Sequence, residues 1–200
     1  MKEMWDQRYS EQEFVYGKGP NLFFKSFIDT HQPGRILLPG EGEGRNALYA
    51  ASKGWEVHAV DFSKVARQKA LQRAKEANLH IRYDEADLAK WDGNGTFDYV
   101  GLIYAHFPEA FRQSLHRKFC EILSPGGQIF MEAFSQDQIH YNSGGPKDIN
   151  MLYSIDMLKH DFQELIIEYL NKQIREMNES QYHEGKASII RFIGQKEIES

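Results

Sequence analysis

The stretch Ile36-Leu37-Leu38-Pro39-Gly40-Glu41-Gly42-Glu43-Gly44 joins a short apolar run to three glycines at alternate positions. A second apolar run, Trp55 to Val60, ends at Asp61. Glycine has no Cβ, so a ligand can approach the main chain of such a turn closely. A carboxylate at the end of the neighbouring strand can accept hydrogen bonds from both hydroxyls of a ribose. The pattern therefore predicts a doubly wound sheet that binds an adenosine cofactor.

Around this stretch the chain alternates between strand and helix patterns, which predicts a mostly parallel sheet with right-handed crossovers. The tail shows three strand-like segments without helices between them, which predicts an antiparallel C-terminal edge. We therefore expect one α/β domain with a Rossmann-like, doubly wound sheet of seven strands. The expected parallel strands are 35–38, 55–60, 80–83, 99–104 and 128–133, and the antiparallel edge is expected within the tail segments 165–170, 173–177 and 187–195. The expected helices are 22–28, 45–53, 64–77 and 109–123.

Three local signals sharpen these boundaries. Asn21 and Ser63 stand where a side chain can cap the helices that follow them. The polar stretch 135–150 contains Gly144-Gly145-Pro146 and predicts a long loop. We expect residues 1–30 to form an aromatic leader and helix over the cofactor site, and residues 31–200 to form the cofactor-binding domain.

Composition excludes several classes of protein. The chain has 200 residues and 41% hydrophobic content, which suits a single globular core. Its net charge of −5 disfavours a nucleic-acid-binding face. The single cysteine, Cys120, excludes an intrachain disulfide and lies in an apolar helical pattern, which predicts a buried thiol in a reducing compartment. Without a signal peptide or a membrane-length apolar run, a cytoplasmic location is expected.

The glycine pattern distinguishes between adenosine cofactors. A dinucleotide fingerprint needs Gly-x-Gly-x-x-Gly, but the third glycine position is Arg45. The chain has Gly-x-Gly-x-Gly instead, followed by Asp61-Phe62-Ser63, Asp87-Leu88 and Pro125-Gly126-Gly127. In order and spacing, residues 36–133 resemble the class I S-adenosylmethionine-dependent methyltransferases. Simple turn chemistry is the alternative explanation of the glycines alone.

The residues at both ends of the chain indicate one branch of these methyltransferases. Trp5, Tyr9 and the run Tyr16-Gly17-Lys18-Gly19-Pro20-Asn21 are similar to the leader of the tellurite-resistance and thiol methyltransferase-like branch. The closing pattern His183-x-Gly185-x-Ala187, followed by Arg191, is similar as well. This resemblance implies methyl transfer to a small soft nucleophile, such as a thiol or a selenium or tellurium oxyanion.

The resemblance also implies roles for individual residues. Those expected to bind S-adenosylmethionine are Gly40, Gly42 and Gly44 at its methionine part, Asp61 at the ribose, Phe62, Asp87 and Leu88 at the adenine, and Tyr104, Ala105 and His106 at the sulfonium. Many class I enzymes carry an acidic residue at the position of Leu38. The residue that binds the methionine part of the cofactor here is therefore left open. Glu41 either holds the cofactor's ammonium group or is a solvated turn residue.

Candidate catalytic residues come from the tail and from the end of the fourth strand. Arg191 can grip an anion through its planar fork, and His183 can donate a hydrogen bond or take a proton. The alternatives are a loop histidine and a strand arginine paired with a carboxylate. His106 either touches the acceptor or caps the next helix, and Glu132 is a further candidate with a sheet-edge ion pair as its alternative. The histidines, cysteine and acids show no metal-ligand spacing, so no metal is expected.

The aromatic leader has two interpretations. Trp5, Tyr9 and Phe14 pack on the outside of the sheet, or Tyr9 and Tyr16 fold over the cofactor, exclude water and contact the sulfonium through cation–π interaction.

Three other functions are alternatives to methyl transfer to a small acceptor. Arg45 disfavours a nicotinamide-dependent reductase, and the acidic balance disfavours a nucleic-acid methyltransferase. A protein that binds the cofactor without turnover stays open because Leu38-Pro39 departs from the usual pattern.

Overall fold

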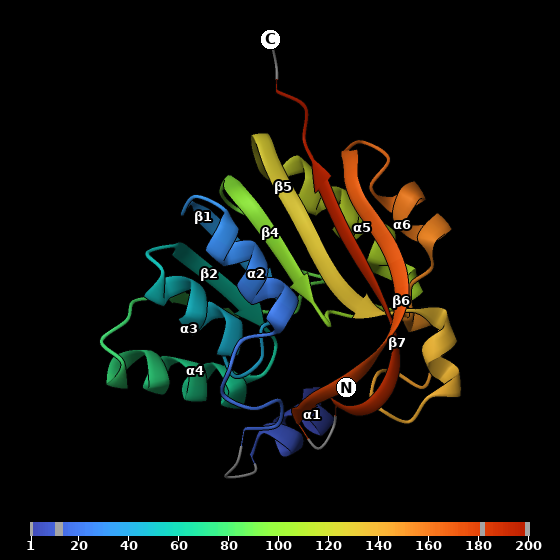
Figure 1. Ribbon diagram of the computed structural model, residues 1–200. Coiled ribbons are helices and arrows are strands. Elements are labelled where there is room, and N and C mark those ends of the chain that lie inside the picture. Colours follow the sequence, from blue (N-terminus) through green and yellow to red (C-terminus); the bar gives the residue numbers. More distant parts are fainter. Residues whose placement is uncertain (1, 11–13, 181–182, 199–200) are drawn as a thin grey trace.

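The computed structural model describes residues 2–10, 14–180 and 183–198 (Figure 1). Within these residues, seven strands form one sheet in the order β3-β2-β1-β4-β5-β7-β6. Strands β1 to β5 pair in parallel, whereas β7 is antiparallel to both β5 and β6. The expected sheet with an antiparallel C-terminal edge is confirmed. The strands are β1 (Arg35–Pro39), β2 (Glu56–Asp61), β3 (Arg82–Glu85), β4 (Phe97–Ile103), β5 (Leu123–Phe134), β6 (Ile166–Ser180) and β7 (His183–Gln195).

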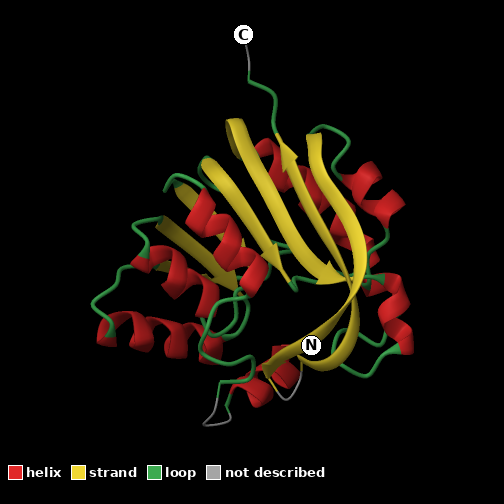
Figure 2. Ribbon diagram, in the orientation of Figure 1, coloured by secondary structure: helices red, strands yellow, loops and turns green. Residues whose placement is uncertain are grey.

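Helices cover both faces of this sheet (Figure 2). One apolar cluster joins α2, α3 and α4 to one face, and a second joins α5 and α6 to the other. The two predicted caps are confirmed: Asn21 Oδ1 accepts from Phe24 N at 2.9 Å, and Ser63 Oγ accepts from Ala66 N at 3.2 Å. The helices are α1 (Lys2–Tyr9), α2 (Leu22–Thr30), α3 (Arg45–Ser52), α4 (Lys64–Glu76), α5 (Glu109–Glu121) and α6 (Ile155–Asp161), with short 3-10 turns η1 (Gln136–His140) and η2 (Ile149–Met151).

The C-terminal half differs from the sequence prediction at β6 and α6, and in the starts of β5 and β7, which begin at Leu123 and His183 rather than at 128 and 187. The two expected segments 165–170 and 173–177 are one continuous strand, β6, because the polar Asn171 and Lys172 lie on an exposed edge where no core face excludes them. Helix α6 was not predicted, since seven residues are too few to show a helical period. Its cap, Ser154 Oγ accepting from Met157 N at 3.1 Å, is the local signal that could have found it.

The predicted loop 135–150 is tied to β7 rather than loose. Gln138 donates to Ser143 Oγ at 3.0 Å and accepts from Ser188 N at 2.8 Å, and both of its polar partners are buried. Ser143 Oγ in turn donates to Lys186 O at 2.6 Å. These hydrogen bonds hold the loop against the N-terminal half of β7.

Cys120 is 3% exposed within the core, as expected, and burial raises the pKa of its thiol to about 12. None of the described helices has the length and apolar character needed to cross a membrane. Among the described side chains, no group of three or more histidine, cysteine or acidic residues could hold a metal ion.

Candidate functional site

The glycine turn after β1 uses the left-handed backbone that glycine favours. Gly40, Gly42 and Gly44 have φ angles of 69°, 62° and 81°. Gly42 N donates to Asp61 Oδ2 at 3.0 Å, and Ser63 N donates to Asp61 Oδ1 at 2.8 Å. Asp61, at the end of β2 and 4% exposed, therefore braces the turn from the neighbouring strand.

Two of these glycines are also required by close contacts. A Cβ on Gly42 would lie 2.7 Å from Tyr9 Oη, and a Cβ on Gly44 would lie 2.7 Å from Ala70 Cβ of α4. Gly44 thus allows α3 and α4 to approach, whereas Gly42 faces a ring of the leader. Burial and the nearby Asp61 raise the pKa of the Tyr9 phenol well above its usual value.

The two acids inside the turn have distinct partners. Glu41 Oε1 accepts from Asn46 N at 2.9 Å and from Ala47 N at 2.7 Å, so it caps the first turn of α3. Burial raises the pKa of Glu41 to about 7, against the opposing effect of these hydrogen bonds. Glu41 is therefore a capping residue rather than a solvated turn residue, and its contact with a cofactor ammonium stays a prediction.

Glu43 joins the turn to the leader. It is 7% exposed, and its Oε2 accepts from Val15 N at 2.8 Å while its Oε1 accepts from Lys69 Nζ at 2.8 Å. Two further cations hold the same segment: Arg45 donates to Tyr16 O at 3.0 Å and Arg73 donates to Lys18 O at 3.1 Å. We call residues 14–18, held in this way by α3, α4 and the turn, the leader clamp.

The residues expected at the adenine lie along the ends of β2 and β3. Phe62 is half-buried directly after Asp61, and Leu88 is buried in the core. Asp87 is exposed, and its Oδ1 accepts from Ala89 N at 3.0 Å within the turn after β3. The carboxyl ends of β2 and β3 therefore bring these residues to one edge of the sheet, and their contact with adenine stays a prediction.

Four aromatic side chains from distant segments meet at the ends of β4 and β5. The ring of His183, 4% exposed, lies 4.7 Å from the ring of Tyr16, 4.7 Å from that of Tyr104 and 5.3 Å from that of Phe134. Tyr104 has a φ of 52°, a left-handed conformation that is uncommon outside glycine and often marks a functional segment. The structure thus brings three predicted site residues, Tyr16, Tyr104 and His183, into one aromatic group.

A buried carboxylate lies behind this aromatic group. Glu132 is 0% exposed, and its Oε1 accepts from Asn21 Nδ2 at 2.7 Å and from Tyr104 Oη at 2.9 Å. Its Oε2 accepts from Arg191 Nε at 2.7 Å and from Arg175 Nη1 at 3.4 Å. Arg191 is therefore paired with a carboxylate, as the alternative interpretation anticipated, and Arg175 is a residue that the sequence analysis did not single out.

His106 is engaged by the backbone on both ring nitrogens. Its Nδ1 lies 2.7 Å from Met151 O, and Phe134 N donates to its Nε2 at 3.4 Å. Burial lowers the pKa of the ring to about 4, so the imidazole is neutral at pH 7. These contacts join β4, β5 and η2, and contact of His106 with an acceptor stays a prediction.

Comparison with known proteins finds matches to the part of the chain that holds this site. Residues 36–127 match the family model described as a methyltransferase domain, and this range includes the glycine turn, Asp61, Asp87 and Tyr104. A protein-L-isoaspartate O-methyltransferase of Pelodictyon phaeoclathratiforme is 27% identical over 137 residues. That alignment covers 62% of this chain and 62% of the relative's length.

Solved structures show the same fold at low sequence identity. TehB from Haemophilus influenzae aligns with a TM-score of 0.75 at 16% identity, covering 98% of this chain and 67% of that one. The N-methyltransferase NodS from Bradyrhizobium japonicum, in complex with S-adenosylhomocysteine, gives a TM-score of 0.72 at 11% identity, covering 98% and 97%. A structure from work on the conversion of a disulfide bond into a thioacetal group in echinomycin biosynthesis gives 0.81 at 18% identity, covering 100% and 93%.

Proposed function

Because this chain carries a methyltransferase domain of the class I, S-adenosylmethionine-dependent type over residues 36–127, we propose that it transfers a methyl group to a small soft nucleophile. The class predicted from the sequence is confirmed by this match. The acceptor class, a thiol or a selenium or tellurium oxyanion, is our proposal. The observation that carries it is the meeting of Tyr16, Tyr104 and His183 beside the end of β4.

The glycine turn and Asp61 fit the cofactor. At Gly40 the main chain is exposed and in a conformation that other residues rarely adopt, which suits close approach of a ligand, whereas Tyr9 packs against Gly42. An ionised carboxylate has about four acceptor positions, so Asp61 can brace Gly42 and Ser63 and still accept from ribose hydroxyls. Gly40, Glu41 and Gly44 would border the methionine part, and Phe62, Asp87 and Leu88 would border the adenine.

Alignment and exclusion of water are the main tasks of the protein in such a transfer. When bound, the cofactor supplies a methyl group already activated by a sulfonium, so a general base matters only for a protonated acceptor. His183 is our candidate to take that proton or to donate a hydrogen bond, and His106 stays a weaker candidate at the same edge. Arg191 holds Glu132, which in turn accepts from Tyr104 at the acceptor side.

Soft, aromatic surroundings favour the sulfur acceptor. Met177 is 1% exposed and its Sδ lies 4.0 Å from Tyr104 Oη, and the Tyr104 ring packs against the rings of Phe134 and His183. Thioether and aromatic groups pack well against polarisable atoms. One of the solved structures, from work on a disulfide-to-thioacetal conversion, has the same fold and supports sulfur as the atom to test first.

We further propose that residues 1–30 cover the cofactor site. Tyr9 is 5% exposed and packs against Gly42. The leader clamp, residues 14–18, is held to α3, α4 and the turn by hydrogen bonds with Glu43, Arg45 and Arg73. In this position Tyr9 and Tyr16 can shield the cofactor from water and stabilise a sulfonium through their ring faces. The Tyr9–Gly42 contact is the observation that favours this arrangement over one in which the leader packs on the outside of the sheet.

The cofactor is tested by ligand-dependent thermal unfolding. We expect S-adenosylhomocysteine to raise the unfolding temperature and NADH to leave it unchanged, because only a ligand of the native state stabilises it. Stabilisation by NADH and not by S-adenosylhomocysteine would mean that the nucleotide site is wrongly assigned.

The acceptor is tested by turnover. Protein is incubated with S-adenosylmethionine labelled in its methyl group and a panel of thiols, selenite and tellurite, and labelled product is counted. We expect transfer to at least one thiol. Cofactor binding without transfer to any member of the panel would favour a larger acceptor or a binding role without turnover.

A further inference from the structure

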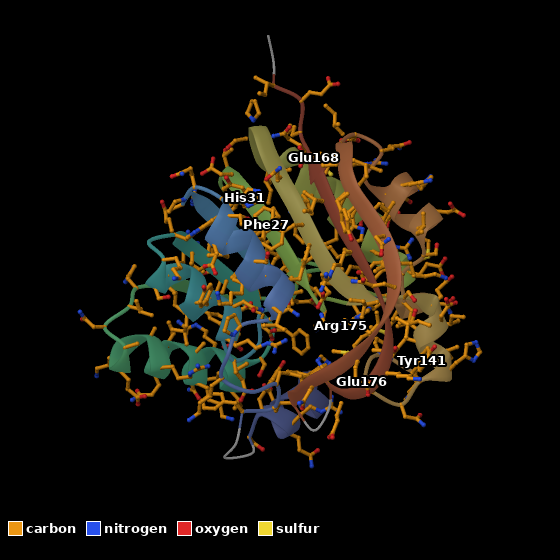
Figure 3. All side chains as sticks on the ribbon, viewed as in Figure 1. Phe27, His31, Tyr141, Glu168, Arg175 and Glu176 are labelled. Atoms are coloured by element: carbon orange, nitrogen blue, oxygen red, sulfur yellow. The ribbon has the colours of Figure 1, made fainter. Side chains whose placement is uncertain are left out.

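Arg175 comes from a part of the chain that extends beyond the parallel sheet. It pairs with Ala187 of β7, whereas β5 ends at Phe134, opposite Ile189. Its side chain is 20% exposed and turns back from β6 to Glu132. Figure 3 shows the labelled Arg175 near the start of α2, while its neighbour Glu176 is exposed. The arginine thus lies beside Glu132, at the proposed acceptor side.

The buried cluster around Glu132 carries more positive than negative charge. One carboxylate is paired with two guanidinium groups, whose side chains are only 22% and 20% exposed. Among the side chains that the structure describes, Glu132 is the one carboxylate that pairs with either arginine. A partly buried positive charge without a full counter-charge is unfavourable, so this cluster favours a negative ligand.

The excess charge belongs to Arg175 rather than Arg191. Arg191 lies directly opposite Glu132 in the sheet, donates to it at 2.7 Å and places its guanidinium 4.8 Å from the centre of the Phe23 ring. Glu132 also accepts from Asn21 and Tyr104, so three short hydrogen bonds already satisfy it. Arg175 adds a fourth and longer contact, 3.4 Å, which uses one of its five donors.

The neighbours of Arg175 divide the proposed acceptor site into a charged part, at Arg175 itself, and a polarisable part, at Met177 and Tyr104. Met177, two residues along β6 and therefore on the same face, contacts Tyr104, which packs on the ring of His183. An acceptor with its nucleophile against these groups and an anionic group several ångströms away would meet the guanidinium. A planar oxyanion matches the fork of an arginine better than any other small group.

We propose that Arg175 binds a carboxylate or similar oxyanion of the methyl acceptor and thereby selects a small anionic thiol over a neutral one. This rests on the proposed methyltransferase function. Arg191 is then a positioning residue that holds Glu132 and Tyr104, and Arg175 is the residue that contacts the acceptor.

The test compares two thiols that differ in charge, thioglycolate and 2-mercaptoethanol, as methyl acceptors. We expect a lower KM for thioglycolate with the natural protein. Arg175→Met should raise that KM about tenfold or more, as expected for a lost charge-assisted hydrogen bond, and leave the KM for 2-mercaptoethanol within about twofold. Arg175→Lys should recover part of the preference. Equal effects on both thiols, or no preference in the natural protein, would overturn the proposal.

Two controls separate this proposal from its premise. Lys186→Met removes an exposed positive charge from β7, opposite Glu176, and should leave the preference intact. Titration calorimetry with S-adenosylhomocysteine tests the premise, and Arg175→Met should bind it like the natural protein, which also shows that the variant is folded. No binding by either protein would defeat the proposed function.

A second calorimetric titration covers the case of no turnover. Thioglycolate is added to protein loaded with S-adenosylhomocysteine, so that binding is measured without transfer. Binding by the natural protein that Arg175→Met loses and Lys186→Met keeps would support the assignment even if neither thiol is methylated. Absence of binding by the loaded natural protein would refute it.

Discussion

Gly42 is a residue at which the turn tolerates a side chain poorly. We expect Gly42→Ala to destabilise the fold by more than the roughly 1 kcal/mol of a left-handed alanine, because its Cβ would also lie 2.7 Å from Tyr9 Oη. Gly54→Ala is a matched control, since Gly54 has a φ of 84° but no atom within 4 Å of the added Cβ. Chemical unfolding and the dissociation constant of S-adenosylhomocysteine are measured for both. Equal losses would show that the Tyr9 contact is unimportant.

His106 gives a pH dependence with a defined sign. Burial lowers the pKa of the folded state from 6.5 to about 4, so the unfolded chain binds more protons between these values. Stability is therefore present above pH 6.5 and is lost as the pH falls towards 4, by at most about 1.4 kcal/mol for each pH unit. We expect His106→Gln to lose less stability than the natural protein between pH 6.5 and 4.5 in urea unfolding. Parallel pH profiles would contradict the burial of a neutral ring.

Single residues were predictable where their signal is local. The glycine turn, Asp61 and the cap Asn21 stand in short patterns whose meaning depends on adjacent residues only. The Glu132 cluster was not predictable as a whole, because it joins Asn21, Tyr104, Arg175 and Arg191 through the register of three strands. Nothing local distinguishes Arg175 from another arginine on an edge strand.

At the scale of elements, the leader clamp depends on a short list of charged contacts. Lys69 of α4 pairs with Glu43 at 2.8 Å, and Glu43 also holds Val15 N. We expect Lys69→Met to speed hydrogen exchange at the Val15 amide and to weaken binding of S-adenosylhomocysteine, because the buried Glu43 loses its counter-charge. The control is Lys75→Met, which removes an exposed cation from the same helix. Unchanged exchange in Lys69→Met would show that the clamp does not depend on this pair.

The predictability of elements follows their length and their caps. Helices α2, α3, α4 and α5 were predicted within a few residues because each shows a helical period over two or more turns. Helices α1 and α6 and the continuous course of β6 were missed, since both helices are short and β6 lies on the sheet edge with polar residues on its exposed face. Edge position is a tertiary property that a single sequence does not encode locally.

At the scale of the whole molecule, Cys120 reports on global unfolding. Its thiol is buried where α5 meets the sheet, and the raised pKa, about 12, keeps it protonated at pH 8. We expect a thiol reagent to label the native protein slowly, at a rate that rises with urea in parallel with the loss of circular dichroism. Rapid labelling without denaturant would show that the core around α5 opens independently of the rest.

The position of Glu43 has a consequence for how ligand entry and leader movement depend on each other. The same turn that offers exposed main chain at Gly40 also holds the leader, because its Glu43 accepts a hydrogen bond from Val15 N. Any ligand that shifts the turn therefore changes the grip on the leader, and by thermodynamic reciprocity any change in that grip alters ligand affinity by the same factor. We therefore expect ligand binding and the position of the leader to be two measures of a single equilibrium.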